Sequence, residues 1–394
     1  MNYKKLFHFV EVKRMEKIKF SNTGYKVTYR SEKIFFLPRE YQLFKFLYQN
    51  PSRIFSREDL LDAVWPMEDP VDRTVDDHIY RVRKKIEPLS SMVKIETIRG
   101  QGYLLSTKEV HESPLLKDNE VSTQVKSLFH KYHLYGQGDA LKLLEENQNA
   151  FGFQIDLPNL LYLHFMKGNF SWFLEEPEIS FWEKCFYLLH IYSFIESDKM
   201  QCLDYFTCAL SAEEIPEYYR LEMKLLNRLY LLIFTKQLDE ATTLLHQSKK
   251  EIEEKNIKGF VPLILLSELY IALLQKNFQK IEERMEETKK ALVNYPYLRE
   301  NADFSIIKGI YSLLKKNESK AEDYIDEGFQ LLQEAKFIPG MIININMILF
   351  YLEEFGMNGR LQTYYQELKK KYIQEYKLNE LHSKIEIQLK YHLK

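Results

Sequence analysis

Cysteine is scarce in this sequence, with three in 394 residues: Cys185, Cys202 and Cys208. None of them forms a CxxC pair or has a Cys/His spacing typical of a metal site, and all three lie among apolar residues with helical periodicity. We therefore expect free, buried thiols and no disulfide framework. Such cysteine usage is typical of the reducing cytoplasm, which is the predicted location.

The sequence also lacks a long hydrophobic run. The longest apolar stretch, Val261–Leu274, has 14 residues and includes a serine and a glutamate, so it is too short to span a bilayer. Near the start, Leu6–Val12 is interrupted by polar residues and is not followed by a small-residue cleavage site. We expect no secretory signal and no membrane partner. Residues 1–16 are predicted to be an N-terminal extension, and the true initiator is either Met1 or Met15.

Signatures of common enzyme sites are missing as well. The sequence contains no P-loop, no HExxH and no GxSxG motif. His130 and His133 lie three residues apart on an expected helix and could share a metal ion, but no third ligand is evident. Ordinary polar helix positions explain the two histidines better. We predict that the protein is not an enzyme and uses no cofactor or metal.

Charge is distributed unequally along the chain, although the net charge is only −2. Residues 1–107 contain 20 Lys and Arg against 14 Asp and Glu, a net charge of +6. Residues 108–394 contain 35 against 43, a net charge of −8. A basic segment attracts nucleic-acid phosphates and an acidic one is repelled by them. The pattern predicts a nucleic-acid-binding module followed by a body that does not touch nucleic acid.

Within residues 17–106 the pattern predicts strands, then three helices, then a hairpin. The expected strands of the first group are Ile18–Phe20, Tyr25–Tyr29 and Ile34–Leu37. The expected helices are Pro38–Asn50, Arg57–Trp65 and Arg73–Glu87, and the expected hairpin pairs Lys94–Ile98 with Tyr103–Leu105. Ser56 and Asp59 fit a capping box for the second helix, and Pro88 ends the third. Glycines in the segment Arg99–Gly102 allow a tight hairpin turn.

The third helix is amphipathic, with cations on its polar face. Val75, Ile79, Val82 and Ile86 form one apolar stripe that would pack on the domain core. The opposite face and its flanks carry the polar residues Arg73, Asp77, His78, Tyr80, Arg81, Arg83, Lys84 and Lys85. A basic helix fixed to a small core by one face fits the major groove of DNA. The charge run alone is equally compatible with a simple solvated face.

Three motifs, in the order and spacing of a known domain, help to decide between a DNA-binding helix and a solvated face. They read LPREYQLFKFLYQNPSRIFSREDLLDAVW, RTVDDHIYRVRKKIEP and IETIRGQGYLL. Together they closely resemble the OmpR/PhoB-type winged-helix effector domain over about residues 17–106. The resemblance implies a bacterial transcription regulator that contacts double-stranded DNA through a recognition helix, 73–87, and a wing, 94–105.

The resemblance also implies roles for individual residues. Arg81 and Arg83 would lie at the major groove, while Thr97 and Arg99 would approach phosphates or the adjacent minor groove. The full candidate DNA-binding set is Arg73, His78, Tyr80, Arg81, Arg83, Lys84, Lys85, Thr97 and Arg99. Many relatives have arginine where this chain has Tyr80, so base preference can differ. The segment Trp65–Asp72 matches a loop that touches RNA polymerase in some relatives, and a plain connecting loop with a buried tryptophan fits equally well.

After a predicted linker, residues 107–118, the chain reads as helical throughout residues 119–394. A pattern repeats there every 40 residues, as in the series Ala241, Ile281, Ala321 and Leu361. Each unit is a helix, a short polar turn and a second helix, so neighbouring units must stack to bury their apolar faces. The repeats resemble tetratricopeptide-type repeats, although their usual unit is shorter. The predicted fold class is therefore multidomain and mainly α: an N-terminal α+β winged helix-turn-helix followed by an all-α solenoid.

Two functions for the helical body remain open at this point. It could sense a peptide or other ligand, similar in logic to Gram-positive peptide-pheromone receptors, with the possible ligand groups Asn294, Arg299, Asn301, Asn344 and Asn346. Helix caps and turns also explain such asparagines. Alternatively the body only forms a homodimer or recruits RNA polymerase. The strand–helix alternation of a phosphorylated receiver domain is missing, so a one-component regulator is expected.

Overall fold

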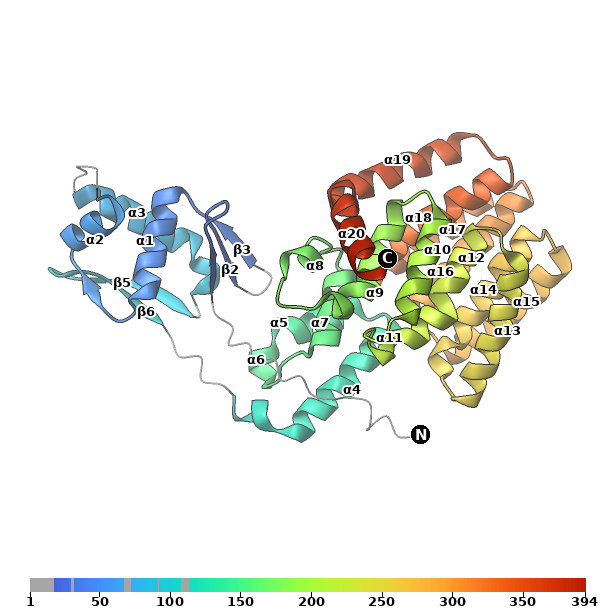
Figure 1. The fold of residues 1–394 in the computed structure, drawn as a ribbon, viewed down its shortest axis with the longest axis horizontal. Helices are drawn as coiled ribbons and strands as arrows, with labels where there is room; N and C mark the ends of the chain where they lie inside the picture. Colours follow the sequence, from blue (N-terminus) through green and yellow to red (C-terminus); the bar gives the residue numbers. More distant parts are fainter. Residues whose placement is uncertain (1–17, 30–31, 67–71, 91, 108–112) are drawn as a thin grey trace. The chain divides into compact units, whose positions relative to one another are not determined.

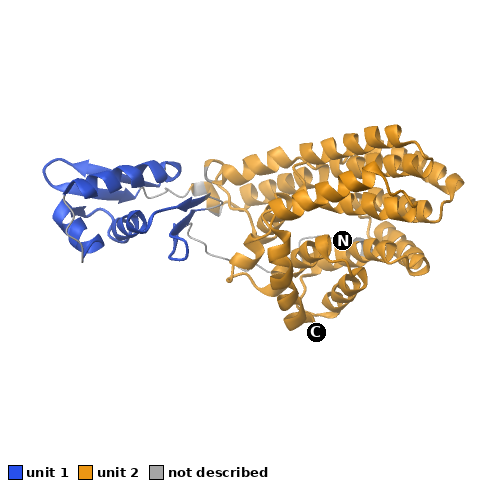
Figure 2. Ribbon diagram, turned by 90° about the horizontal axis from the view of Figure 1, so that it is seen from above, with its two compact units in different colours: residues 1–112 blue, residues 113–394 orange. Residues whose placement is uncertain are grey.

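The computed structural model describes residues 18–29, 32–66, 72–90, 92–107 and 113–394. Two compact units divide the chain between Glu112 and Ser113 (Figure 2). The first combines small β-sheets with helices, and the second is helical, so the predicted mainly α fold class is confirmed (Figure 1). The expected extension, residues 1–16, and residues 108–112 of the expected linker lie outside the described residues.

Unit 1 contains two three-stranded antiparallel sheets, with strand orders β1-β2-β3 and β4-β6-β5. Their strands are β1 Lys19–Ser21, β2 Lys26–Tyr29, β3 Glu32–Phe35, β4 Ile54–Phe55, β5 Val93–Ile98 and β6 Gly102–Thr107. The sequence pattern did not predict β4, which pairs Ile54 with Leu104 and Phe55 with Tyr103. A strand of two residues has no periodicity of its own, so only its tertiary pairing defines it.

The helices of unit 1 are α1 Pro38–Gln49, α2 Arg57–Val64 and α3 Asp72–Lys85. Ser56 caps α2 as predicted: its Oγ accepts from the Asp59 amide at 3.0 Å, and the Asp59 carboxylate accepts from the Ser56 amide at 2.8 Å. The prediction of α3 as Arg73–Glu87 is wrong at its end, because Glu87–Leu89 forms a separate 3-10 turn. Pro88 causes this early end, since its ring disfavours α-helical geometry in the residue before it.

Unit 2 contains no strand among residues 113–394. After a 3-10 turn at Pro114–Lys117, its helices are α4 Asn119–Tyr135, α5 Gly138–Glu146, α6 Gln148–Phe151, α7 Leu157–Met166, α8 Trp172–Glu175, α9 Phe181–Ile195, α10 Lys199–Ser211, α11 Glu217–Glu222, α12 Arg228–Phe234, α13 Leu238–Glu254, α14 Val261–Leu274, α15 Phe278–Asn294, α16 Leu298–Leu314, α17 Glu318–Glu334, α18 Ile338–Glu354, α19 Arg360–Glu375 and α20 Leu378–Leu393. A π-helical turn, Met223–Asn227, joins α11 to α12.

The 40-residue period of the sequence recurs in the backbone. Helices α12, α14, α16 and α18 each end just before a residue with positive φ, at Lys236, Lys276, Lys316 and Gly356. A left-handed residue at this place stops the helix and turns the chain. Each turn leads into the second helix of a hairpin, so the predicted helix–turn–helix units are present. Their assignment to the tetratricopeptide type stays a prediction.

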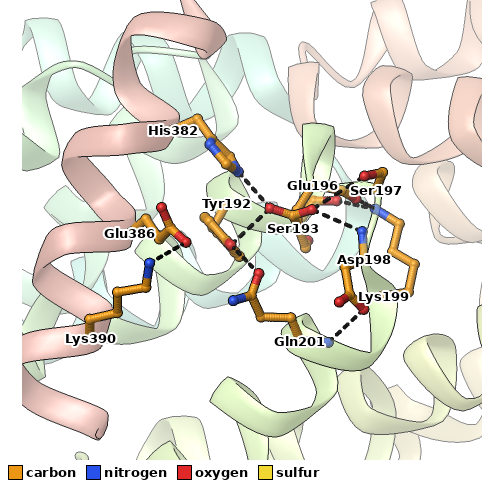
Figure 3. Close-up of polar contacts among 10 residues, drawn as sticks. All are labelled: Tyr192, Ser193, Glu196, Ser197, Asp198, Lys199, Gln201, His382, Glu386 and Lys390. Atoms are coloured by element: carbon orange, nitrogen blue, oxygen red, sulfur yellow. Dashed lines mark hydrogen bonds and ion pairs between the residues drawn. The ribbon is translucent and has the colours of Figure 1, made fainter.

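The last helix packs back on an early part of unit 2. Three residues on one face of α20, Leu381, Ile385 and Leu389, are buried. His382 of the same helix lies 2.9 Å from the Glu196 carboxylate and stacks on the ring of Tyr192, which belongs to α9 (Figure 3). Residues nearly two hundred positions apart are therefore joined by both apolar and polar contacts.

The three cysteines are free thiols. Cys185 and Cys202 are buried as predicted, whereas Cys208 is half-buried, so the expectation was wrong for this residue. Six residues along α10 rotate Cys208 well away from the face that buries Cys202. None of the helices among the described residues is both long and apolar enough to cross a bilayer.

Candidate nucleic-acid interface

Helix α3 is held in unit 1 by its apolar stripe. Val75, Ile79 and Val82 have no exposed surface and pack in the same core as Phe44 and Leu60 of α1 and α2. Burying side chains of this size contributes about 1.5–3 kcal/mol each. The rest of the helix circumference is thereby turned outward.

The outward face of α3 carries Arg73, Asp77, Tyr80, Arg81 and Lys84, all of which are exposed. The Tyr80 side chain is 59% exposed, and the Lys84 ammonium lies 5.0 Å from the centre of its ring. Arg73 and Arg81 form no hydrogen bond or ion pair with other described residues. Their guanidinium groups can therefore donate to an outside acceptor.

Arg83 is directed differently from Arg81. Its Nε donates to the Ile95 carbonyl and its Nη2 to the Thr97 hydroxyl, both at 2.9 Å. Its guanidinium also lies 5.7 Å from the ring centre of Tyr103. Arg83 thus ties α3 to both strands of the β5–β6 hairpin, and two predicted DNA contacts, Arg83 and Thr97, are bonded to each other.

Lys85 is paired inside the unit. Its ammonium lies 2.7 Å from the carboxylate of Glu40, a side chain that is almost fully buried in α1. The same carboxylate accepts from the Leu37 amide at the start of α1. Burial would raise the pKa of Glu40, but the bonds from Lys85 and Leu37 outweigh it and lower that pKa. Lys85 therefore joins α3 to α1.

His78 also makes contacts within unit 1. Its Nδ1 lies 2.7 Å from the Thr74 carbonyl one turn earlier, and its ring meets the ring of Trp65 edge-on at 5.0 Å. Trp65 is buried. The sequence left two interpretations of the Trp65–Asp72 loop open: a contact with RNA polymerase, or a plain connecting loop with a buried tryptophan. Its tryptophan packs in the core. Residues 67–71 of the loop lie outside the described residues.

A polar network that sequence reasoning missed links α2, α3 and β6. Arg57 Nε donates to the Asp76 carboxylate at 2.8 Å, and the Tyr103 hydroxyl donates to the same carboxylate at 2.6 Å. Burial would raise the pKa of Asp76, yet the bonds from Tyr103 and Arg57 hold it below its ordinary value. Nothing in the sequence pairs these residues, because they lie up to 46 positions apart.

The turn between β5 and β6 depends on two glycines. Gly100 and Gly102 have φ values of +74° and +131°. A Cβ on Gly102 would lie 1.9 Å from the Phe55 carbonyl oxygen of β4, so no other residue fits there. Arg99, at the tip, is exposed and makes no bond with other described residues. The tip of the hairpin therefore presents a cation that is unpaired among the described residues.

The family model for "Transcriptional regulatory protein, C terminal" matches residues 31–105. Over 99 residues the chain is 39% identical to the phosphate regulon transcriptional regulatory protein PhoB of Escherichia coli. The matched segment is 25% of this chain and 43% of that protein. Residues 31–105 are an OmpR/PhoB-type winged-helix domain. In this domain α3 has the place of the family's recognition helix, and the β5–β6 hairpin has the place of its wing.

Two further proteins are similar to the winged-helix domain. The heme response regulator HssR of Staphylococcus epidermidis is 46% identical over 66 residues, 16% of this chain and 30% of that protein. The solved DNA-binding domain of CadC from E. coli is 26% identical, covers 22% of this chain and 82% of that chain, and has a TM-score of 0.21. The chain thus spans less than half the length of the curated relatives PhoB and HssR.

The helical unit that follows the winged-helix domain holds the five predicted ligand residues, and the structure brings only some of them together. The amide of Asn344 donates to the Asp303 carboxylate at 2.6 Å, and Asp303 lies one turn from Arg299 on α16. Asn294 and Asn301 donate to carbonyls of their own helices, and Asn346 donates to the Phe194 carbonyl of α9. Arg299 and Asn344 therefore share one polar cluster, and the other three do not join it.

Proposed function

We propose that the protein is a sequence-specific DNA-binding transcription regulator that acts as a homodimer in the cytoplasm. The recognition helix lies in the major groove, where Arg81 contacts base edges. Arg73, Lys84 and the wing residue Arg99 bind phosphates. The observation that supports this best is the outward face of α3, whose arginines are exposed and unpaired among the described residues while its opposite face is fixed in the core.

Arg83, Lys85, His78 and Thr97 have a different role in this proposal. Each is bonded within unit 1, so each positions the recognition helix and the wing before DNA arrives. Preorganised donors lose less conformational entropy on binding than free side chains do. Tyr80, whose ring centre lies 5.0 Å from the Lys84 ammonium, contacts the DNA backbone or a thymine methyl.

The helical unit regulates DNA binding through a ligand or partner. The cluster around Arg299 supports a ligand, because two of the five candidate residues meet there. The bonds of Asn294, Asn301 and Asn346 to backbone carbonyls support the second function, in which the repeats only form the dimer or recruit RNA polymerase.

Selection of sheared genomic DNA on the purified full chain tests the proposal. Wild type should recover discrete regions, and sequencing them gives the operator. Arg81→Ala should lose this enrichment, whereas the control Lys45→Ala, which removes a cation from α1, should keep it. Equal, unenriched recovery by wild type and Arg81→Ala would contradict sequence-specific binding.

A further inference from the structure

A cluster of charged side chains lies inside the helical unit. Helix α16 contributes Arg299, Glu300 and Asp303, and the end of α11 contributes Glu222. The charges of Arg299 and Glu300 act on the pKa of both Glu222 and Asp303, so the four groups lie near one another. The cluster has three carboxylates and a single cation.

Arg299 is bonded to neutral groups. Its Nη1 donates to the Tyr162 hydroxyl at 3.1 Å and its Nη2 to the His133 carbonyl at 3.0 Å. Its Nε is buried and has no hydrogen-bond partner among the described residues. Among the described residues, Arg299 forms no ion pair with Glu222, Glu300 or Asp303, whose charges act on it only from a distance. The guanidinium is therefore held in place by uncharged partners from α4 and α7 and leaves the carboxylates without a direct counter-ion.

Two other buried groups in the cluster lack partners. Glu300 is 5% exposed, and its Oε2 accepts no hydrogen bond from the described residues. Asn344 is 1% exposed; its amide nitrogen holds Asp303, while its Oδ1 is unpartnered. Both of these unpartnered oxygens are acceptors, and Arg299 Nε is an unpartnered donor in the same cluster. A buried acceptor left unsatisfied costs about 1–3 kcal/mol.

The burial of these carboxyl groups changes their pKa values. Burial, with a smaller contribution from the charge of the neighbouring Glu300, raises the pKa of Glu222 to about 7 and that of Asp303 to about 7. Such shifts gather at functional sites more often than elsewhere. Glu222, Arg299 and Asp303 are nevertheless half-buried, so solvent reaches them.

The cluster has more carboxylates than cations, so a positively charged group would balance it. No group of three His, Cys, Asp or Glu side chains among the described residues converges closely enough to hold a metal ion. A protonated amine carries up to three N–H donors, and carboxylate and amide oxygens accept such bonds.

We propose that Glu222, Glu300, Asp303 and the Asn344 carbonyl oxygen bind a protonated amine of the ligand that regulates this protein. The amine donates to the two unpartnered oxygens and balances the carboxylates. This proposal names the chemistry of the regulating ligand. The regulatory role of the amine therefore rests on the proposed function. The binding itself does not depend on DNA.

Calorimetric titration of the full chain tests the proposal with three probes that carry amines: putrescine, spermidine and trialanine amide with a free amino terminus. Saturable binding of at least one is expected at about pH 8, with affinity at least about tenfold weaker at about pH 6, where Glu222 and Asp303 take up protons. The N-acetylated peptide should not bind. Binding by polyamines alone or by the free peptide alone distinguishes the two sources of the amine.

Matched variants separate ligand binding from structure. Glu222→Gln and Asp303→Asn remove a charge with little change of shape and should each weaken binding at least about tenfold. Glu286→Gln, on the exposed face of α15, should bind like wild type. No saturable binding of any probe, or unchanged binding in both cluster variants, would overturn the proposal.

The same samples distinguish this failure from failure of the proposed function. Wild type that binds an amine but enriches no genomic DNA contradicts only the DNA-binding proposal. Wild type that enriches DNA and binds no amine contradicts only the cluster proposal.

Discussion

Single residues of the recognition helix divide into those that face outward and those that hold the domain together. Arg81 and Arg83 are two positions apart and carry the same charge, yet Arg81 is unpaired among the described residues while Arg83 donates two bonds to β5. Arg83 therefore contributes to both stability and wing position, and Arg81 to neither. The two residues can be separated experimentally.

We predict that Arg83→Ala lowers the free energy of unfolding of unit 1 by about 1–3 kcal/mol, since two hydrogen bonds to the hairpin are lost. Arg81→Ala should change that stability by less than about 0.5 kcal/mol, because an exposed unpaired side chain is removed. Denaturant unfolding followed by circular dichroism of both variants checks this. Equal losses in the two variants would contradict the different roles.

The acidic residues that bind Arg57 and Lys85 predict acid sensitivity. Asp76 and Glu40 have pKa values lowered in the folded state, so their stabilising effect is present above their ordinary pKa values of 3.8 and 4.5. It is lost as the pH falls below those values and through the lower, folded-state pKa values. The melting temperature of unit 1 should therefore fall steeply below about pH 4. In Asp76→Asn this fall should be shallower than in wild type; an identical pH profile would show that Asp76 does not contribute.

The sequence could identify which residues lie on the polar face of α3, but not which of them form hydrogen bonds or ion pairs within unit 1. The apolar stripe follows from helical periodicity, so Val75, Ile79 and Val82 were predicted correctly as core residues. The bonds of Arg83 and Lys85 end on residues from other elements, a strand backbone and a carboxylate 45 positions away. Such partners depend on tertiary packing, which periodicity does not describe.

At the scale of elements, the wing depends on close packing between strands. Gly102 leaves room for the Phe55 carbonyl of β4, a strand too short to be predicted. The hairpin itself and the Ser56 cap were predicted from local residue types, since turns and caps act within a few residues. The ends of α3 were less predictable, because Pro88 acts on the residues before it.

Two glycine variants test the wing. Gly102→Ala places a Cβ against a backbone carbonyl at positive φ and should cost at least about 2 kcal/mol of stability. Gly100→Ala has open space around it, so only the left-handed backbone should matter, at about 1 kcal/mol. Thermal unfolding measures both. A smaller loss in Gly102→Ala than in Gly100→Ala would mean that β4 and the wing are not packed as described.

For the whole molecule, the 40-residue period predicted the helical hairpins but not the return of α20 to α9. The contact between His382 and Glu196 joins segments 186 positions apart, and no repeat pattern encodes it (Figure 3). The Arg299 cluster is similar, with hydrogen-bond partners 137 and 166 positions away from that arginine. The sequence thus predicts the helical hairpins of this unit but not the long-range polar contacts that join them.

Variants of α20 test the importance of this return. Ile385 is fully buried, so Ile385→Ala should lower the stability of the helical unit by about 2–5 kcal/mol. Ile387 on the same helix is 68% exposed, and Ile387→Ala should have an effect below about 0.5 kcal/mol. Calorimetry should show the loss in the helical-unit transition only. A shift of equal size in both variants would contradict the packing of α20 on α9.

The central claim is that the outward face of α3 reads DNA sequence, and one measurement tests it most directly. The affinity of wild type, Arg81→Ala and Lys45→Ala is compared on an enriched genomic fragment and on an unrelated duplex of equal length. Arg81→Ala should lose about 1–3 kcal/mol on the enriched fragment, as expected for a bidentate base contact, and far less on the unrelated duplex. An equal loss on both duplexes would reduce Arg81 to a phosphate contact, and no loss on either would contradict the account.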